Sequence, residues 1–252
     1  MGFEDHFSTI AKNYSRFRPR YPEALFDYLS SLAPGNELAW DCGAGNGQAA
    51  ASLASRFRHV TATDASREQI SHAQAHPRVD YRVEQAEDSS LPSGCCDLIT
   101  SAVAVHWFNF DRFYETVRRV LRPGGVLAVW TYHLLESEAE IDALVQEYYA
   151  GVLAGYWPER IRYLAGRYRT LPFPFEEIPP PALHLEIEWD LNQLAGFLAS
   201  WSAAQKYLEE NGRHPLEVIW PRLSAVWGDA EHRRLLRWPL YLRVGRPAPP
   251  KL

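Results

Sequence analysis

Residues 41–47 read Asp41-Cys42-Gly43-Ala44-Gly45-Asn46-Gly47, and this glycine-rich motif is the strongest indication of the fold. It lies between residues 38–40, which predict a short strand, and residues 48–57, which predict a helix. Glycines let the main chain turn sharply and approach a ligand, and the first turn of a helix offers unpaired N–H groups. Asp64 ends the next predicted strand, where its carboxylate can accept hydrogen bonds from both hydroxyls of a ribose. These features predict a site for an adenosine-containing ligand.

The acid before the first glycine distinguishes between two such ligands. A dinucleotide-binding turn has the pattern G-x-G-x-x-G/A, which requires a small residue where this chain has Gln48. Asp41 would repel a pyrophosphate, whereas it can bind a cationic amino group directly or through water. S-adenosylmethionine carries that amino group and no phosphate. The sequence therefore favours S-adenosylmethionine over NAD as the cofactor.

The first half of the chain alternates predicted strands with predicted helices. Strands are predicted at residues 38–40, 59–63, 79–83, 97–103 and 126–131, and helices at 22–32, 48–57 and 111–121, with one more helix opened by the capping pair Ser66 and Gln69. Strands separated by helices of this length imply a parallel sheet with helices on both faces. We therefore expect an α/β fold.

The second half contains more predicted helices than strands, and it therefore predicts a helical addition to the sheet domain. Helices are predicted at residues 136–154, 156–168, 191–210 and 215–227, strands at 184–189 and 238–244, and an extended proline-rich connector at 171–181. We expect an N-terminal cap segment with the first helix at 1–35, the cofactor-binding core at 36–132, a helical lid or substrate region with a late strand at 133–230, and a closing strand with a tail at 231–252.

Charge and cysteine content exclude several classes of protein. The 252 residues carry 26 Lys and Arg against 31 Asp and Glu, a net charge of −5, which argues against a partner such as a nucleic acid or an anionic membrane. No apolar run approaches the roughly 20 residues of a membrane helix, and the first residues do not resemble a secretory signal. Three cysteines cannot form a disulfide framework, and no residue spacing resembles a metal site. We expect a cytoplasmic protein without a metal; nothing in the sequence specifies its oligomeric state.

The chain resembles the class I S-adenosylmethionine-dependent methyltransferases. The resemblance runs from about Phe7 to Thr131 and rests on D-x-G-x-G-x-G at 41–47, Asp64, Ala86-Glu87-Asp88, Asp97-Leu98-Ile99 and Leu121-Arg122-Pro123-Gly124-Gly125. It implies a Rossmann-like, doubly wound sheet of seven strands, mostly parallel with the last strand antiparallel, and a helical lid.

Further segments are similar to one branch of that family, the trans-aconitate and cantharidin-resistance type of small-molecule methyltransferase. They are Tyr14-Ser15-Arg16-Phe17-Arg18-Pro19-Arg20-Tyr21-Pro22, Ala104-Val105-His106-Trp107-Phe108, Trp201 to Tyr207 and Trp238-Pro239-Leu240. The branch implies a small-molecule methyl acceptor, with oxygen as the expected target atom.

The resemblance also implies roles for individual residues. Gly43 and Gly45 would face the methionine part of the cofactor, and Asp64 would bind the ribose. Ala65 would lie against the adenine, and Ala86 and Glu87 would lie at the adenine edge. Ala102 and Val103 would approach the sulfonium, while Tyr14 and Arg18 would close over the methionine carboxylate. Purely structural interpretations stay open: Glu87 could be a solvated loop acid, and Tyr14 and Arg18 could only attach the N-terminal segment to the sheet.

Methyl transfer is an in-line displacement, to which the protein contributes positioning and exclusion of water. A carboxylate acceptor is already ionised and needs no base, whereas a phenol or amine needs a proton acceptor, for which His106 is the candidate unless it is structural. Candidate lining residues of the acceptor pocket are Trp107, Trp130, Tyr132 and Trp201. Two other functions stay open at this point: an NAD-dependent oxidoreductase and a protein that binds S-adenosylmethionine without catalysis.

Overall fold

The computed structural model describes residues 19–248, which form two compact units. The sheet unit comprises residues 21–132, 162–183 and 240–248, and the helical unit comprises residues 133–161 and 184–239 together with residues 19 and 20. Residues 162–183 lie within the segment that the sequence assigns to a lid, yet they belong to the sheet unit.

The sheet runs in the order β3-β2-β1-β4-β5-β8-β6, and β7 also pairs with β8. The strands are β1 Leu38–Cys42, β2 His59–Asp64, β3 Val79–Val83, β4 Cys96–Ala102, β5 Leu121–Thr131, β6 Glu176–Glu177, β7 Leu183–Trp189 and β8 Arg234–Arg246. The first five are parallel, and β8 is antiparallel to both β5 and β6. The predicted Rossmann-like, mostly parallel sheet is confirmed.

Two strands differ from the sequence prediction. The two-residue strand β6 lies in the proline-rich segment that predicts only an extended connector, where Glu176 pairs with Arg246 and Glu177 with Gly245. β5 begins at Leu121, so Arg122-Pro123-Gly124-Gly125 lies inside the strand, in the register shift between the pairs Cys96–Leu121 and Leu98–Val126. Glycine and proline are therefore tolerated here at an irregular end of the ladder.

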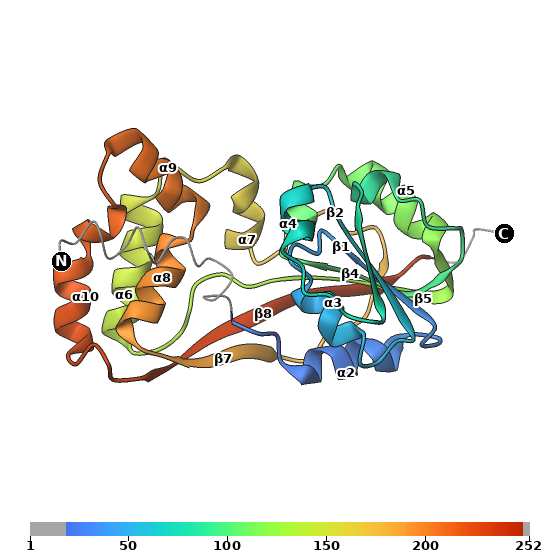
Figure 1. Ribbon diagram of the computed structural model, residues 1–252, viewed down its shortest axis with the longest axis horizontal. Helices are drawn as coiled ribbons and strands as arrows, with labels where there is room; N and C mark the ends of the chain where they lie inside the picture. Colours follow the sequence, from blue (N-terminus) through green and yellow to red (C-terminus); the bar gives the residue numbers. More distant parts are fainter. Residues whose placement is uncertain (1–18, 249–252) are drawn as a thin grey trace. The chain divides into compact units, whose positions relative to one another are not determined.

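The helices of the sheet unit are short: α2 Glu23–Leu32, α3 Gln48–Leu53, α4 Arg67–Ser71, α5 Phe110–Val120 and α7 Arg162–Ala165. Of these, α2 and α3 lie on one side of the sheet and α5 lies on the other (Figure 1). The predicted cap of α4 is confirmed, because Oγ of Ser66 accepts a hydrogen bond from the N–H of Gln69 at 3.2 Å. In α5, Phe113, Val117 and Val120 are buried at helical spacing, which fixes the face that packs on the sheet.

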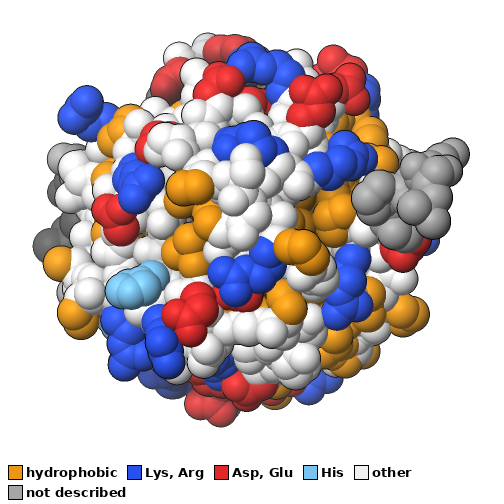
Figure 2. All heavy atoms as spheres, turned by 90° about the vertical axis from the view of Figure 1, so that its right-hand side faces the viewer, with side chains coloured by type: hydrophobic (Ala, Val, Ile, Leu, Met, Phe, Trp, Pro, Cys, Tyr) orange, Lys and Arg blue, Asp and Glu red, His pale blue; other side chains and the backbone are white. Residues whose placement is uncertain are grey.

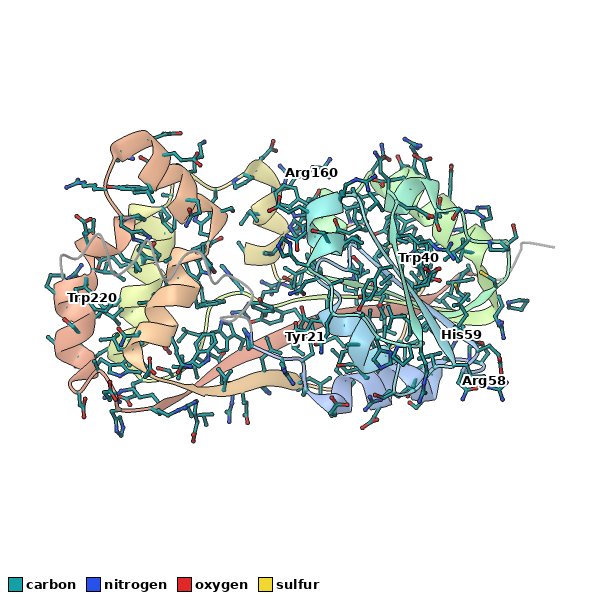
Figure 3. All side chains as sticks on the ribbon, viewed as in Figure 1. Tyr21, Trp40, Arg58, His59, Arg160 and Trp220 are labelled. Atoms are coloured by element: carbon teal, nitrogen blue, oxygen red, sulfur yellow. The ribbon has the colours of Figure 1, made fainter. Side chains whose placement is uncertain are left out.

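Two aromatic residues mark the core on the two sides of this sheet. Trp40, labelled in Figure 3, is completely buried in β1; its ring lies 6.5 Å from that of Phe113, and its Nε1 donates to Oγ1 of Thr63 at 2.9 Å. Trp130 in β5 is also completely buried, with the ring of Phe26 in α2 at 6.4 Å. The alternation of side chains along a strand sends successive residues to opposite faces, so both layers are apolar.

The helical unit breaks its predicted helices into shorter pieces. Its elements are α6 Ala139–Glu147, the π-helical turn Tyr148–Val152, the 3₁₀ turns Glu159–Ile161 and Pro215–Val218, α8 Leu191–Ala199, α9 Ser202–Asn211 and α10 Trp220–Trp227, with residues 184–189 of β7 and 234–239 of β8. The predicted helix over 191–210 is divided at Ser200 and Trp201, where Trp201 has the extended conformation of an N-cap residue. No helix within residues 19–248 is long and apolar enough to cross a membrane.

Candidate functional site

The glycine turn follows β1 at the carboxyl edge of the parallel strands. Gly43 and Gly47 have φ angles of +67° and +86°, in the left-handed region that side chains other than hydrogen disfavour. A Cβ at Gly43 would lie 2.4 Å from Cβ of Ala104, and one at Gly47 would lie 2.5 Å from Oη of Tyr81. The chain therefore requires glycine at both positions for conformation and for space.

Asp41 is a completely buried acid with one unpartnered oxygen. Its Oδ1 accepts a hydrogen bond from Oγ1 of Thr100 in β4 at 2.8 Å, whereas its Oδ2 has no hydrogen-bond partner among the residues described. Burial raises the pKa of this carboxyl from its ordinary value of 3.8 to about 7; the Thr100 bond and the main-chain N–H of Ala50 oppose the shift, and the charge of Asp64 adds to it. An unsatisfied buried carboxylate oxygen fits a ligand that brings a cationic donor.

Asp64 links the ends of β1 and β2. Its Oδ2 accepts from the N–H of Gly45 at 2.9 Å, and its Oδ1 accepts from the N–H of Ser66 at 2.8 Å. The acid therefore holds the glycine turn and the start of the following helix. Each carboxylate oxygen has a second lone pair, which leaves it able to accept from ribose hydroxyls as well. Ala65, the next residue, is exposed beside it.

The segment expected at the adenine edge is a 3₁₀ turn over Ala86–Asp88. Ala86 is buried, and Glu87 is half-buried. Oε1 of Glu87 accepts a hydrogen bond from the N–H of Asn109 at 2.7 Å, and its main-chain oxygen accepts from Oγ1 of Thr116 at 2.7 Å. Glu87 is thus tied to the beginning of α5 and is not simply a solvated loop acid.

β4 ends at Ala102 and continues into a left-handed residue. Val103 has a φ of 53°, which is rare for a β-branched side chain, and its N–H donates to the carbonyl of Trp130 at 2.9 Å. Because β4 lies beside β1, this exit shares the carboxyl edge of the sheet with the glycine turn. Ala102, Val103 and the turn are therefore brought to the same edge.

His106 is almost completely buried in the 3₁₀ turn Val105–Trp107. Its Nδ1 lies 2.9 Å from Oη of Tyr168, and its ring lies 4.8 Å from that of Trp107. Trp107 itself is 49% exposed. The edge of the sheet therefore combines a buried imidazole with an accessible indole.

The other predicted pocket residues have different surroundings. Trp130 is buried, with the ring of Tyr21 at 5.4 Å, so it packs the core of the sheet unit. Tyr132 is half-buried at the end of the same unit, and Trp201 belongs to the helical unit, where the rings of Trp157 and Tyr148 lie at 5.6 and 5.7 Å. Two predicted cofactor residues, Tyr14 and Arg18, lie outside the described residues.

Two contributors to this edge were not predicted from the sequence. Thr100, which anchors Asp41, lies in the predicted strand 97–103 beside a second hydroxyl, Ser101, so the strand pattern alone does not single it out. Tyr168, the partner of His106, has no local signal either, because 62 residues separate the two and the sequence predicts a helix through Tyr168. Within residues 19–248, no group of His, Cys, Asp and Glu has the arrangement of a metal site.

The order of the strands gives the class of protein. Following β1, the chain builds outward through β2 and β3, then returns to place β4 on the other side of β1. Ligands of open α/β sheets bind outside the carboxyl ends of the strands at such a switch point. Asp41, the glycine turn and Asp64 lie there, so the fold and the site define a Rossmann-like protein of the kind that binds an adenosine-containing cofactor.

Comparisons with known proteins identify the family. The family description "Methyltransferase domain" matches residues 40–129. A methyltransferase of Dictyostelium discoideum is 35% identical over 251 residues, covering 97% of this chain and 95% of its own. The S-adenosylmethionine-dependent methyltransferase CRG1 of Saccharomyces cerevisiae is 26% identical over 239 residues, covering 81% of this chain and 82% of its own. A solved structure described as a type II methyltransferase from Anaeromyxobacter dehalogenans has a TM-score of 0.85 at 45% identity, covering 92% of this chain and 99% of its own.

The chain belongs to the S-adenosylmethionine-dependent methyltransferases. Its cofactor is S-adenosylmethionine, as the acid at position 41 predicts. The alternatives of an NAD-dependent oxidoreductase and of a binding protein without catalysis are set aside by these relatives. The orphaned Oδ2 of Asp41 and the side-chain-free turn at Gly43 fit such a cofactor.

Proposed function

We propose that this methyltransferase methylates a small molecule at oxygen, and that the oxygen belongs to a hydroxyl group. The observation that carries the proposal is the buried imidazole of His106 at the carboxyl edge of β4, with Nδ1 held by Tyr168 at 2.9 Å. An oriented histidine near the reacting atoms serves as a general base for an acceptor that must lose a proton. A carboxylate acceptor would need no such group.

The residues of the carboxyl edge supply the binding site in this proposal. Asp41 takes the cationic amino group, Gly43 and Gly45 admit the methionine part, and Asp64 takes the ribose hydroxyls. Ala65, Ala86 and Glu87 surround the adenine, and Ala102 and Val103 line the sulfonium by their main chain. Tyr14 and Arg18, which lie outside the described residues, would take the carboxylate. When bound, S-adenosylmethionine supplies a methyl group on a positively charged sulfur. The protein binds and orients both partners and excludes water.

Surface charge supports a small molecule over a nucleic acid as the acceptor. The chain has a net charge of −5, and on the face in Figure 2 acidic and basic side chains are interspersed without a large positive patch. A nucleic-acid substrate is bound largely through clustered Lys and Arg. The exposed indole of Trp107 instead offers a flat apolar surface beside His106, which suits a planar or apolar acceptor.

The proposal also includes the branch of the methyltransferase family to which this chain is assigned. The similarity to CRG1 over 81% of this chain supports assignment to the trans-aconitate and cantharidin-resistance type that the N-terminal and His106 segments resemble. Within that branch, a carboxylate and a hydroxyl are the two oxygen acceptors to be distinguished. The chemistry of the product separates them, because a methyl ester is cleaved by mild base and a methyl ether is not.

The experiment is transfer of a labelled methyl group from S-adenosylmethionine to a fractionated metabolite extract. We expect one or a few labelled small molecules whose label resists mild base. His106→Gln should reduce transfer by about 100-fold or more, in the range lost with a general base. His59→Gln is the matched control, because His59 is exposed at the amino end of β2 (Figure 3). Base-labile label, or full activity in the His106 variant, would refute a hydroxyl acceptor activated by this histidine.

A further inference from the structure

The contact between Tyr168 and His106 joins two buried side chains within the sheet unit. Tyr168 is completely buried and His106 is 1% exposed, and Oη of Tyr168 lies 2.9 Å from Nδ1 of His106. Burial raises the pKa of Tyr168 well above its ordinary value, so its hydroxyl keeps its proton. Tyr168 is therefore a neutral hydrogen-bonding group and not itself a base.

The direction of this hydrogen bond determines which nitrogen of His106 can accept a proton. If Nδ1 carries the hydrogen, Nε2 is the acceptor; if the phenol donates to Nδ1, Nε2 carries the hydrogen and cannot act as a base. The 2.9 Å separation is compatible with either direction.

The proposed function decides between the two directions. Nδ1 is the ring nitrogen that faces Tyr168, so a proton from the acceptor is taken by Nε2. Nε2 of a neutral imidazole can take that proton when the ring hydrogen is on Nδ1. In that tautomer Nδ1–H donates to the oxygen of Tyr168, across the 2.9 Å that separates them.

The main chain at Tyr168 adopts a conformation that side chains disfavour. Arg167 and Tyr168 have φ angles of 55° and 57°, and within residues 19–248 the one other non-glycine residue with positive φ is Val103. Bulky residues rarely adopt this conformation, and such strain gathers at functional sites. A left-handed residue also ends a helix, and the N–H of Tyr168 does donate to the carbonyl of Tyr163 at 2.8 Å. Helix termination alone, however, favours glycine, and the glycine of this segment is Gly166, before the strained pair.

Arg243 of β8 fixes the strained segment in place. Its Nη1 donates to the carbonyl of Leu171 at 2.6 Å and to that of Tyr168 at 3.3 Å, and its guanidinium lies 4.8 Å from the ring centre of Phe173. Glu177 pairs with the same guanidinium. The position of the Tyr168 phenol is therefore determined by several independent contacts.

We propose that Tyr168 is a positioning residue that holds His106 in the tautomer with hydrogen on Nδ1, so that Nε2 is the base for methyl transfer. This inference rests on the proposed function. The proton of the acceptor's hydroxyl moves to Nε2, the electron pair of its oxygen forms the bond to the methyl carbon, and the pair of the broken sulfur–carbon bond stays on sulfur. His106 leaves the step as an imidazolium whose Nδ1–H still donates to Tyr168.

The first test reads the tautomer directly and needs no methyl acceptor. Ring-nitrogen NMR shifts of isotope-labelled histidine, at a pH where the ring is neutral, should report hydrogen on Nδ1 of His106 in the wild type, with His106→Gln giving the assignment. In Tyr168→Phe the hydrogen should move to Nε2. Tyr114→Phe is the matched control, because Tyr114 is a buried phenol of the same core that donates to the carbonyl of Pro172 instead. Hydrogen on Nε2 in the wild type, or a tautomer unchanged in Tyr168→Phe, would overturn the proposal.

The second test measures catalysis with an acceptor identified by the labelling experiment. Tyr168→Phe should lower kcat by about 10-fold or more, as loss of an orienting partner does, with the affinity for S-adenosylhomocysteine kept within about 2-fold. Tyr114→Phe should keep kcat. A tautomer that shifts in Tyr168→Phe with kcat unchanged refutes the link to catalysis. Full activity of His106→Gln refutes the role of His106 as the base in the proposed function. In that case the tautomer measurement still tests whether Tyr168 sets the tautomer of His106.

Discussion

Oδ2 of Asp64 accepts a hydrogen bond from the main-chain N–H of Gly45 at 2.9 Å. The contact ties the acid at the end of β2 to the glycine turn that follows β1. One carboxylate therefore both shapes the turn and, in our proposal, binds the ribose of the cofactor. Substitutions at Asp64 test the ribose assignment.

Asp64→Ala should weaken binding of S-adenosylhomocysteine by at least about 100-fold, because hydrogen bonds to a charged group contribute about 1.5–3 kcal/mol each. Asp64→Asn loses the charge and keeps one acceptor oxygen, while its amide NH2 can accept from neither N–H, so an intermediate loss is expected. Asp80→Asn is the control, since Asp80 is an exposed acid of β3 paired with Arg82. Titration calorimetry measures all three. Unchanged affinity in Asp64→Ala would contradict the ribose assignment.

Asp41 should make the unliganded protein less stable as the pH rises. Its pKa in the folded protein is about 7 against an ordinary 3.8, so folding is favoured by its proton and that contribution is lost as the pH rises towards the folded pKa. The free energy of unfolding should fall by up to about 1.4 kcal/mol per pH unit between about pH 5 and 7 from this group alone. Asp41→Asn cannot titrate, so the wild type should lose more stability than the variant over that range. Parallel pH dependences in denaturant unfolding would contradict the raised pKa.

The same acid should give cofactor binding the opposite pH dependence. The amino group of S-adenosylmethionine needs a negative partner, so its affinity should rise as the pH passes through about 7 and the carboxyl of Asp41 ionises. Asp41→Asn should bind at least about 10-fold more weakly at about pH 8 and lose most of this dependence. Calorimetry across the pH range provides the measurement. Equal affinity of variant and wild type would show that Asp41 does not bind the amino group.

Local patterns were sufficient to predict most of the sheet. Apolar runs between helices located β1 to β5, and the capping pair Ser66 and Gln69 located α4, because these signals depend on neighbours in the chain. The helix boundaries of the helical unit were harder to predict, since the division at Trp201 depends on side chains packed around it from other segments. Propensity summed along a segment cannot report where tertiary packing ends a helix.

The residues of the candidate site divide in the same way, into those that local sequence predicts and those that depend on tertiary contacts. Asp41, Gly43 and Asp64 lie in one motif and one strand end, so their spacing carried the information. Tyr168 contacts His106 from a left-handed main chain to which Arg243 donates hydrogen bonds, and neither this conformation nor a contact across 62 residues can be read from local sequence. Long-range partners of a predicted residue therefore require the fold.

Gly43→Ala and Gly94→Ala separate steric clash from backbone strain. Both glycines have similar positive φ angles, +67° and +64°, but a Cβ at Gly43 would meet Ala104 at 2.4 Å and one at Gly94 would meet nothing within 4 Å. Gly94→Ala should cost about 1–2 kcal/mol of stability, and Gly43→Ala about 1–3 kcal/mol more. Thermal unfolding measures the difference. Equal losses would show that the turn has room for a side chain.

Trp107→Ala should affect the acceptor more than the fold. Because Trp107 is 49% exposed, its removal should change the free energy of unfolding by no more than about 0.5–1 kcal/mol, while KM for the acceptor rises and kcat falls less. Leu235→Ala is the control, since Leu235 is 51% exposed in the helical unit. An unchanged KM would remove Trp107 from the proposed acceptor pocket.

Arg243→Met should release the strained segment that carries Tyr168. The substitution keeps an apolar stem against Phe173 but removes the hydrogen bonds to the carbonyls of Tyr168 and Leu171, which should cost about 2–3 kcal/mol. Hydrogen exchange over residues 163–171 should accelerate more than exchange elsewhere in the sheet unit. Arg237→Met is the control, because the ion pair of Arg237 with Glu186 is exposed and should contribute under about 1 kcal/mol. If the two variants lose equal stability, or exchange at 163–171 stays slow, Arg243 is not what holds Tyr168 against His106.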